Sequence, residues 1–167
     1  MLVPEHQCML ARAVTIDDII ETLGFFTNWE ERYRFLIELG EKLPPMDPAD
    51  QTETTRVHGC MSKVWITAKP SAADPSELVL AGDSDASTVK GLVALLITLY
   101  SGKTAQEIGQ IDADSVFDKM GLFDHLSPTR HVGVYAMVEH IKRLAECSIG
   151  KLDDCGSRDL GRAAAVS

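Results

Sequence analysis

Apolar residues in the first part of the chain recur at helical spacing. They return every three or four positions after Thr15 and again after Asn28, both of which are residue types that cap helices. This pattern predicts one short helix ending near Gly24 and a second ending at Gly40. The polar, proline-containing stretch that follows the second helix is expected to run over the surface as a loop.

Two segments with alternating apolar and polar residues come next, at 61–68 and 77–81, and a turn-rich segment separates them. The simplest pairing is an antiparallel hairpin. In such a hairpin the end of the second strand lies beside the start of the first. Residues 82–85 should therefore lie next to Gly59 and Cys60.

The residues after this hairpin predict a buried helix over 86–100, apolar on most of its circumference. Ser84 or Asp85 is expected to cap it, and Gly102 to stop it. Gly91 lies in its interior and should destabilise it unless another backbone packs there.

The remainder of the chain also has helical spacing. Thr104 starts a short predicted helix, a second one ends at Gly121, and a long one runs from Ser127 to about Cys147. These elements predict an α+β fold in which a small antiparallel sheet packs against several helices.

Three segments follow from this division. Residues 1–14 are expected to be an N-terminal tail, 15–147 to be one folded domain, and 148–167 to be a flexible C-terminal tail.

Composition narrows the class of protein. The chain has 167 residues, is 45% hydrophobic and carries a formal net charge of −9. An acidic chain without a basic patch is a poor partner for nucleic acid or for anionic membranes. No apolar run is long enough to span a bilayer, and the start lacks the pattern of a signal peptide. We therefore expect a soluble cytoplasmic protein.

The four cysteines, Cys8, Cys60, Cys147 and Cys155, are widely spaced. Their spacing is not that of a disulfide framework or of a zinc site, so we expect reduced thiols and no metal. Cys60 alone lies within the strongly patterned region, where a loop becomes a strand. Gly59 before it permits backbone conformations and close approaches that other residues do not.

The reactivity of Cys60 depends on its surroundings. A nearby helix N-terminus would lower the pKa of its thiol, whereas Asp83 and Asp85 would raise it, so the net direction stays open. His58 is a candidate base only if the segment is extended there.

The sequence around Cys60 resembles the SufE/CsdE family of sulfur acceptors. The resemblance covers roughly residues 15–147 and departs from the usual motif at Met61, where the family has glutamine or another polar residue. It is carried by Asn28-Trp29-Glu30-Glu31-Arg32-Tyr33, Ile37-Glu38-Leu39-Gly40, Arg56-Val57-His58-Gly59-Cys60-Met61-Ser62-Lys63-Val64-Trp65, Gly82-Asp83-Ser84-Asp85-Ala86, Val89-Lys90-Gly91-Leu92 and Leu126-Ser127-Pro128-Thr129-Arg130.

The resemblance implies a fold like that of the iron–sulfur scaffold superfamily and a role for Cys60 as a persulfide carrier. Cys60 would accept sulfur from a pyridoxal-phosphate-dependent cysteine desulfurase, stimulate that enzyme, and pass the sulfur to an iron–sulfur scaffold or another acceptor. Arg130 matches a family arginine that engages the desulfurase, and Arg56, His58 and Gly59 are expected to contact the same partner. The chain would act as an accessory subunit and would need no cofactor of its own.

Two other functions remain open. An iron–sulfur scaffold needs about three converging cysteines or equivalent ligands, whereas Cys60 stands alone in the folded region. A thiol-based redox protein would use a cysteine of low pKa to reduce peroxide.

Overall fold

The structure is a computed structural model of the chain, and it describes residues 14–149. Two helices come first, α2 (Ile16–Phe25) and α3 (Trp29–Glu41). Thr15 forms a capping box at the start of α2, and the side chain of Asn28 accepts a backbone hydrogen bond at the start of α3. Both predicted helices are confirmed, with α3 continuing one residue past Gly40.

The sheet has three antiparallel strands in the order β1-β2-β3: β1 (Val64–Pro70), β2 (Glu77–Ser84) and β3 (Lys103–Thr104). The predicted hairpin is confirmed, and its register pairs Val64 with Ser84. β3 was not predicted, because two residues are too short to show any periodicity.

The first strand begins three residues later than predicted. The N–H of Val57 donates to the carbonyl of Val64 at 2.8 Å, and the N–H of Ile66 donates to Thr55 at 2.9 Å. Residues 55–57 therefore pair with the outer edge of β1, and residues 58–63 close a loop between the paired segments. We call residues 58–63 the Cys60 loop.

The other elements are mostly helical, and the predicted α+β class is confirmed. The short 3₁₀ helices η1 and η2 were not predicted, whereas the four longer helices match the expected order. These elements are η1 (Pro48–Asp50), α4 (Ser87–Tyr100), α5 (Ala105–Gln110), α6 (Ala113–Met120), η2 (Phe123–His125) and α7 (Pro128–Ser148).

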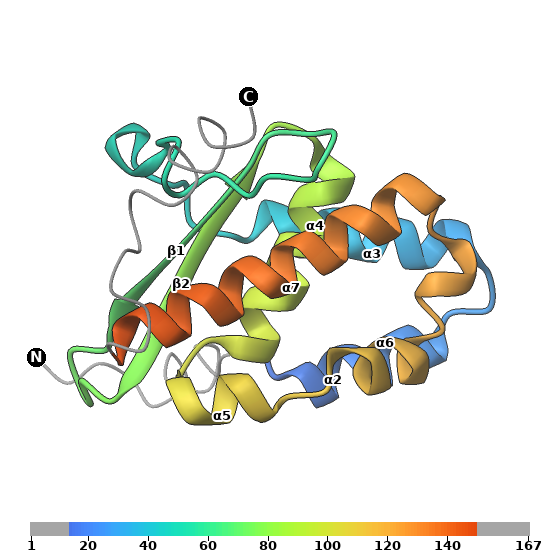
Figure 1. Ribbon diagram of the computed structural model, residues 1–167. Helices are drawn as coiled ribbons and strands as arrows, with labels where there is room; N and C mark the ends of the chain where they lie inside the picture. The colour runs from blue at the N-terminus through green and yellow to red at the C-terminus, as the bar shows by residue number, and fades with distance from the viewer. Residues whose placement is uncertain (1–13, 150–167) are drawn as a thin grey trace, which may run out of the picture.

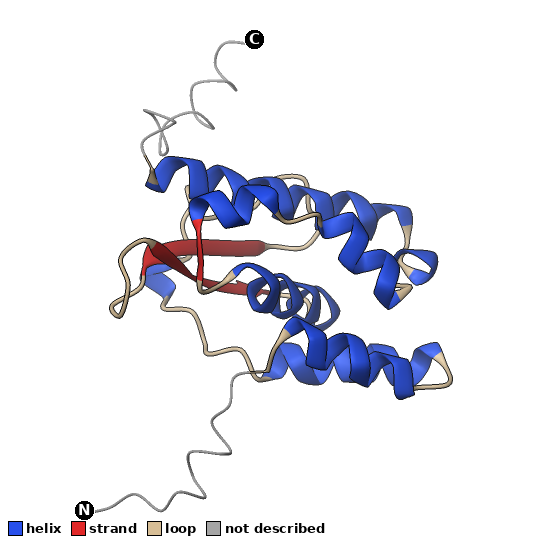
Figure 2. Ribbon diagram, turned by 90° about the horizontal axis from the view of Figure 1, so that it is seen from below, coloured by secondary structure: helices blue, strands red, loops and turns tan. Residues whose placement is uncertain are grey.

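Helix α4 lies at the centre of the molecule, between α3 and α7 (Figures 1 and 2). It packs on the buried face of the sheet at Gly82, where a Cβ would lie 2.7 Å from the side chain of Val93 and 3.0 Å from the carbonyl oxygen of Trp65. The apolar side chains of β1, β2, α4 and α7 meet in one hydrophobic core.

Two glycines fix how closely α3 and α4 approach. A Cβ on Gly91 would lie 2.7 Å from the carbonyl carbon of Leu36, and a Cβ on Gly40 would lie 2.7 Å from the backbone nitrogen of Gly91. Another backbone therefore does pack against Gly91. This crossing positions the first turn of α4, which forms one wall of the candidate site.

The predicted cap of α4 is wrong. Its N-cap is Ala86, and no side chain caps the helix. Ser84 is still part of β2, and the carboxylate of Asp85 accepts the N–H of Lys63 at 3.0 Å. Both expected caps are thus engaged at the hairpin, and the first N–H groups of α4 have no side-chain acceptor.

The tails predicted at 1–14 and 148–167 lie outside the described residues, apart from Val14, Ser148 and Ile149. Within the described range α7 ends at Ser148, one residue beyond the predicted boundary. The division into one domain and two tails stays a prediction.

Replacing Gly91 by alanine should destabilise the fold, because the new methyl group would overlap the backbone of Leu36. Overpacking of this kind costs about 1–3 kcal/mol of unfolding free energy. Urea denaturation measures the change.

Gly109→Ala is the matched control, since nothing lies within 4 Å of a Cβ at that helical position. It should leave stability unchanged or raise it by about 0.5–1 kcal/mol. Equal stability of the two variants would contradict the described crossing of α3 and α4.

Candidate functional site

The Cys60 loop has its own local geometry. Its ends are joined by the backbone pairing of Val57 with Val64, so Cys60 lies within a closed loop between two extended segments. Gly59 has a φ of +100°, a conformation that residues with a Cβ rarely adopt. The turn at Gly59 directs the loop onto α7.

The thiol of Cys60 lies against the backbone of α7. Its Sγ donates a hydrogen bond to the carbonyl oxygen of Gly133 at 3.4 Å. A Cβ on Gly133 would lie 3.4 Å from the same Sγ, and a Cβ on Gly59 would lie 3.2 Å from that of Ala136. Glycine on both sides of the contact allows the loop and the helix to meet this closely.

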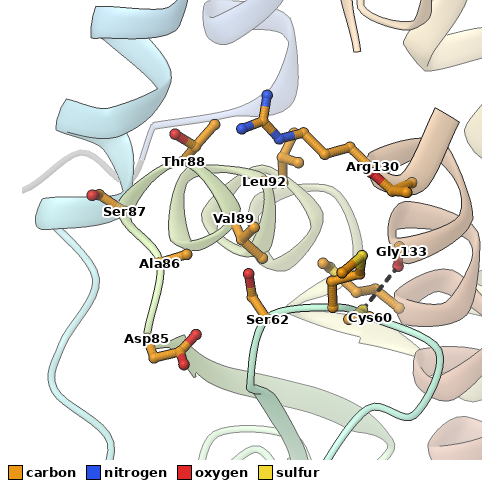
Figure 3. Close-up of a pocket in the computed structure, with 13 residues that line it drawn as sticks. Cys60, Ser62, Asp85, Ala86, Ser87, Thr88, Val89, Leu92, Arg130 and Gly133 are labelled. Atoms are coloured by element: carbon orange, nitrogen blue, oxygen red, sulfur yellow. Dashed lines mark hydrogen bonds between the residues drawn. The ribbon is translucent and has the colours of Figure 1, made fainter. Parts of the chain in front are cut away.

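A cavity of about 350 Å³ opens beside Cys60 (Figure 3). The Cys60 loop, the first turns of α4 and the first turns of α7 surround it. Val89, Leu92 and Met137 give it apolar walls, while Ser87 and Thr88 belong to the start of α4 that no side chain caps. The positive end of the helix dipole therefore faces the cavity.

Arg130 brings a charge to this cavity. Its side chain extends from α7 across the cavity toward α4 (Figure 3). Within residues 14–149 its guanidinium forms no ion pair and no hydrogen bond to a side chain. Together with the start of α4, this cation makes the space beside Cys60 favourable for an anionic sulfur.

Burial of Cys60 has the opposite effect, because it favours the neutral thiol over the thiolate. Cys60 is half-buried, and desolvation raises the pKa of its thiol above the ordinary value of 9.0. The resting thiol is therefore protonated near neutral pH, consistent with its role as donor to Gly133. The direction of this shift, which the sequence left open, is upward.

The predicted site residues fall into two groups. Arg130 and Cys60 line the same cavity, although 70 positions separate them in the sequence. Arg56 instead pairs with Trp65 at the edge of the sheet and has its guanidinium 3.6 Å from the carboxylate of Glu53. His58 is exposed on the loop and is not among the residues lining the cavity.

Gly133 is a functional position that the sequence did not reveal, whereas the start of α4 lies beside the same cavity as Cys60, as the hairpin predicted. Gly133 follows the first turn of a helix, where glycine is unfavourable, and this was a signal that a close contact occurs there. No local pattern indicates that Cys60 is the residue it contacts.

Cys147 is disulfide-bonded, so the expectation of reduced thiols is wrong at that position. Among the described residues Cys60 is the free cysteine. Within the same residues, no three His, Cys, Asp or Glu side chains gather closely enough to hold a metal ion. No helix between residues 14 and 149 has the length and apolar character needed to cross a bilayer.

The fold and the site define an α+β protein that presents one free, half-buried cysteine beside a cavity. Residues 17–145 match the family model described as SufE, an Fe-S metabolism associated domain. The chain therefore belongs to the SufE family, whose role is sulfur transfer in Fe–S metabolism together with cysteine desulfurases.

Relatives support the same assignment. An uncharacterized SufE-like protein from Rhizobium meliloti (strain 1021) is 45% identical over 134 residues, which cover 79% of this chain and 95% of that protein. Another from Rhizobium etli is 42% identical over 134 residues, covering 79% and 90%. The solution structure of a hypothetical protein from Thermus thermophilus has a similar fold, with a TM-score of 0.65 at 21% identity over 80% of this chain and 95% of the other.

The raised pKa of Cys60 predicts slow alkylation of the native thiol at neutral pH. The rate of iodoacetamide labelling follows the thiolate, so its midpoint should lie above pH 9.0 in the native protein and move down after denaturation. Mass spectrometry of the Cys60 peptide follows this thiol separately from the other cysteines. A native midpoint below that of the denatured chain would contradict the buried resting position.

Proposed function

We propose that Cys60 accepts sulfane sulfur from the persulfide of a pyridoxal-phosphate-dependent cysteine desulfurase and passes it on for iron–sulfur cluster assembly. The observation that carries this proposal is a free thiol facing a cavity with room for a bound sulfur atom. Membership of the SufE family supports the kind of partner.

The transfer is an exchange between two sulfurs. The thiolate of Cys60 attacks the terminal sulfur of the partner's persulfide, and a new bond forms between that sulfur and Sγ. The sulfur–sulfur bond of the partner breaks, and its cysteine leaves as a thiolate, which takes up the proton that the Cys60 thiol lost before the attack. One sulfane sulfur moves and no external oxidant or reductant is required.

The cavity suits the product of this step. A persulfide on Cys60 would extend beyond Sγ into a space walled by Leu92 and Met137, which limits access of water and of other thiols. Arg130 and the uncapped start of α4 favour its anionic form.

Delivery requires the bound sulfur to leave this cavity. The thiolate of the acceptor must attack the terminal sulfur, which releases the thiolate of Cys60. Movement of the Cys60 loop away from α7 would break the 3.4 Å contact with Gly133 and present the persulfide. The final acceptor is an iron–sulfur scaffold or another sulfur-using protein.

The raised pKa of Cys60 weighs against the redox alternative, because rapid peroxide reduction relies on a stable thiolate. We include a cytoplasmic location in the same proposal, because the carrier needs Cys60 to be reduced and the cytoplasm keeps thiols reduced. The disulfide at Cys147 is unusual for that compartment.

Cys60→Ser should abolish stimulation of the desulfurase while the fold stays intact, because the hydroxyl is nearly isosteric but does not form a persulfide. The rate of alanine formation from cysteine, measured with saturating variant, should fall to that of the desulfurase alone. The variant should still bind and therefore compete with the wild-type chain. Undiminished stimulation by Cys60→Ser would refute the proposal.

Arg130→Ala should weaken the desulfurase complex about tenfold, which is typical of removing an interface arginine. Titration of the two proteins measures this affinity, and the alkylation rate of Cys60 should change far less. Arg34→Ala, which removes an exposed arginine from α3, is the control for lost charge. Equal affinity of wild type and Arg130→Ala would show that Arg130 does not engage the partner.

A further inference from the structure

Loading with sulfur changes what Cys60 needs from its surroundings. The resting thiol donates a hydrogen bond through Sγ to the carbonyl oxygen of Gly133 at 3.4 Å. In a persulfide Sγ is bonded to a second sulfur and carries no hydrogen, so this hydrogen bond is lost. The terminal sulfur holds the negative charge once it is deprotonated, and a charged acceptor is stabilised by a donor. The loaded state therefore requires a donor inside the cavity, which a carbonyl group cannot provide.

Ser62 carries a hydroxyl group that meets this requirement. It is half-buried and lines the same cavity as Cys60. Its hydroxyl points into the space between the Cys60 loop and the first turn of α4 (Figure 3). Within residues 14–149 this hydroxyl forms no hydrogen bond. Its hydrogen is thus available to an acceptor inside the cavity.

The anchored end of the Cys60 loop fixes the position of Ser62. Lys63 exchanges two hydrogen bonds with Asp85: its N–H donates to the carboxylate at 3.0 Å, and its carbonyl oxygen accepts the N–H of Asp85 at 3.2 Å. The following residue, Val64, pairs with Val57. Ser62 directly precedes this anchored segment, so its hydroxyl is in place before the sulfur arrives.

The other polar groups around the cavity do not replace this donor. Asp85 is negative and therefore disfavours an anionic sulfur. The side chain of Arg130 extends toward α4 rather than toward Cys60, and the hydroxyls of Ser87 and Thr88 also extend away from Cys60 (Figure 3). Arg130 thus contributes its charge from a distance, whereas a direct hydrogen bond needs a donor on the loop itself.

We infer that the hydroxyl of Ser62 donates a hydrogen bond to the terminal sulfur of the Cys60 persulfide and holds the transferred sulfur inside the cavity. Ser62 is a catalytic residue in this sense, because it touches the reacting sulfur in the loaded state and leaves the resting thiol to Gly133. The inference rests on the proposed function. It names the residue of this chain that recognises the sulfur after transfer.

The test follows the terminal sulfur and the resting thiol separately. Wild type and Ser62→Ala are loaded by a cysteine desulfurase with cysteine, purified from the enzyme, and labelled with iodoacetamide over a range of pH. Peptide mass spectrometry distinguishes the labelled persulfide from the labelled thiol by one sulfur. In Ser62→Ala the midpoint of persulfide labelling should rise by about one pH unit, because the anion loses a charge-assisted hydrogen bond. The midpoint of the resting thiol should not change.

Two variants serve as controls. Ser62→Thr keeps a hydroxyl at this position and should keep the wild-type midpoint of persulfide labelling. Ser115→Ala removes an exposed serine of α6 that does not line the cavity, and it should leave both midpoints unchanged. If the desulfurase loads wild type but not Ser62→Ala, inorganic polysulfide supplies the sulfur for the same measurement.

Different outcomes overturn different claims. If wild-type Cys60 is loaded and Ser62→Ala has the wild-type persulfide midpoint, Ser62 is not the donor and the proposed function stands. Equal shifts of the thiol and persulfide midpoints also refute the inference, since they show a general change of the loop. If an active desulfurase places no sulfur on wild-type Cys60, the proposed function fails and the inference fails with it.

Discussion

The contact between Cys60 and the backbone of Gly133 determines where the reactive sulfur lies. Without a side chain at position 133, the loop can place Sγ against a helical carbonyl and beside the cavity. The rest of the fold maintains this contact. The pairing of residues 55–57 with β1 closes the loop, and the crossing at Gly91 sets the position of α4, which forms the opposite wall.

The site combines two opposing electrostatic effects. Burial raises the pKa of the Cys60 thiol and keeps it protonated, whereas Arg130 and the uncapped start of α4 favour negative charge in the adjoining space. A protonated resting thiol is protected from unwanted reactions, and the anionic product is stabilised once sulfur arrives. Reaction therefore depends on an encounter that changes the surroundings of the loop, which suits a carrier that should react with a particular partner.

Sequence reasoning found the elements better than it found their contacts. The caps at Thr15 and Asn28, the hairpin and the buried helix after it followed from local patterns, and the structure confirms them. The closure of the Cys60 loop depends on backbone hydrogen bonds that leave no pattern in side chains. The predicted caps of α4 failed because Asp85 is engaged by Lys63 across the hairpin, a tertiary contact.

In the site, too, local sequence patterns do not show which residues meet in the folded chain. Cys60 was identified by its place after Gly59 where a loop becomes a strand, and Arg130 came from a resemblance to a family. Only the three-dimensional packing shows that they line one cavity. Gly133 was not identified, because a glycine inside a helix signals a close contact but does not show which residue makes it. Incubation with an active cysteine desulfurase and cysteine, followed by peptide mass spectrometry, tests the central claim most directly. We expect one added sulfur on the Cys60 peptide and none on the Cys60→Ser protein. An unmodified Cys60 peptide beside an active desulfurase would contradict it.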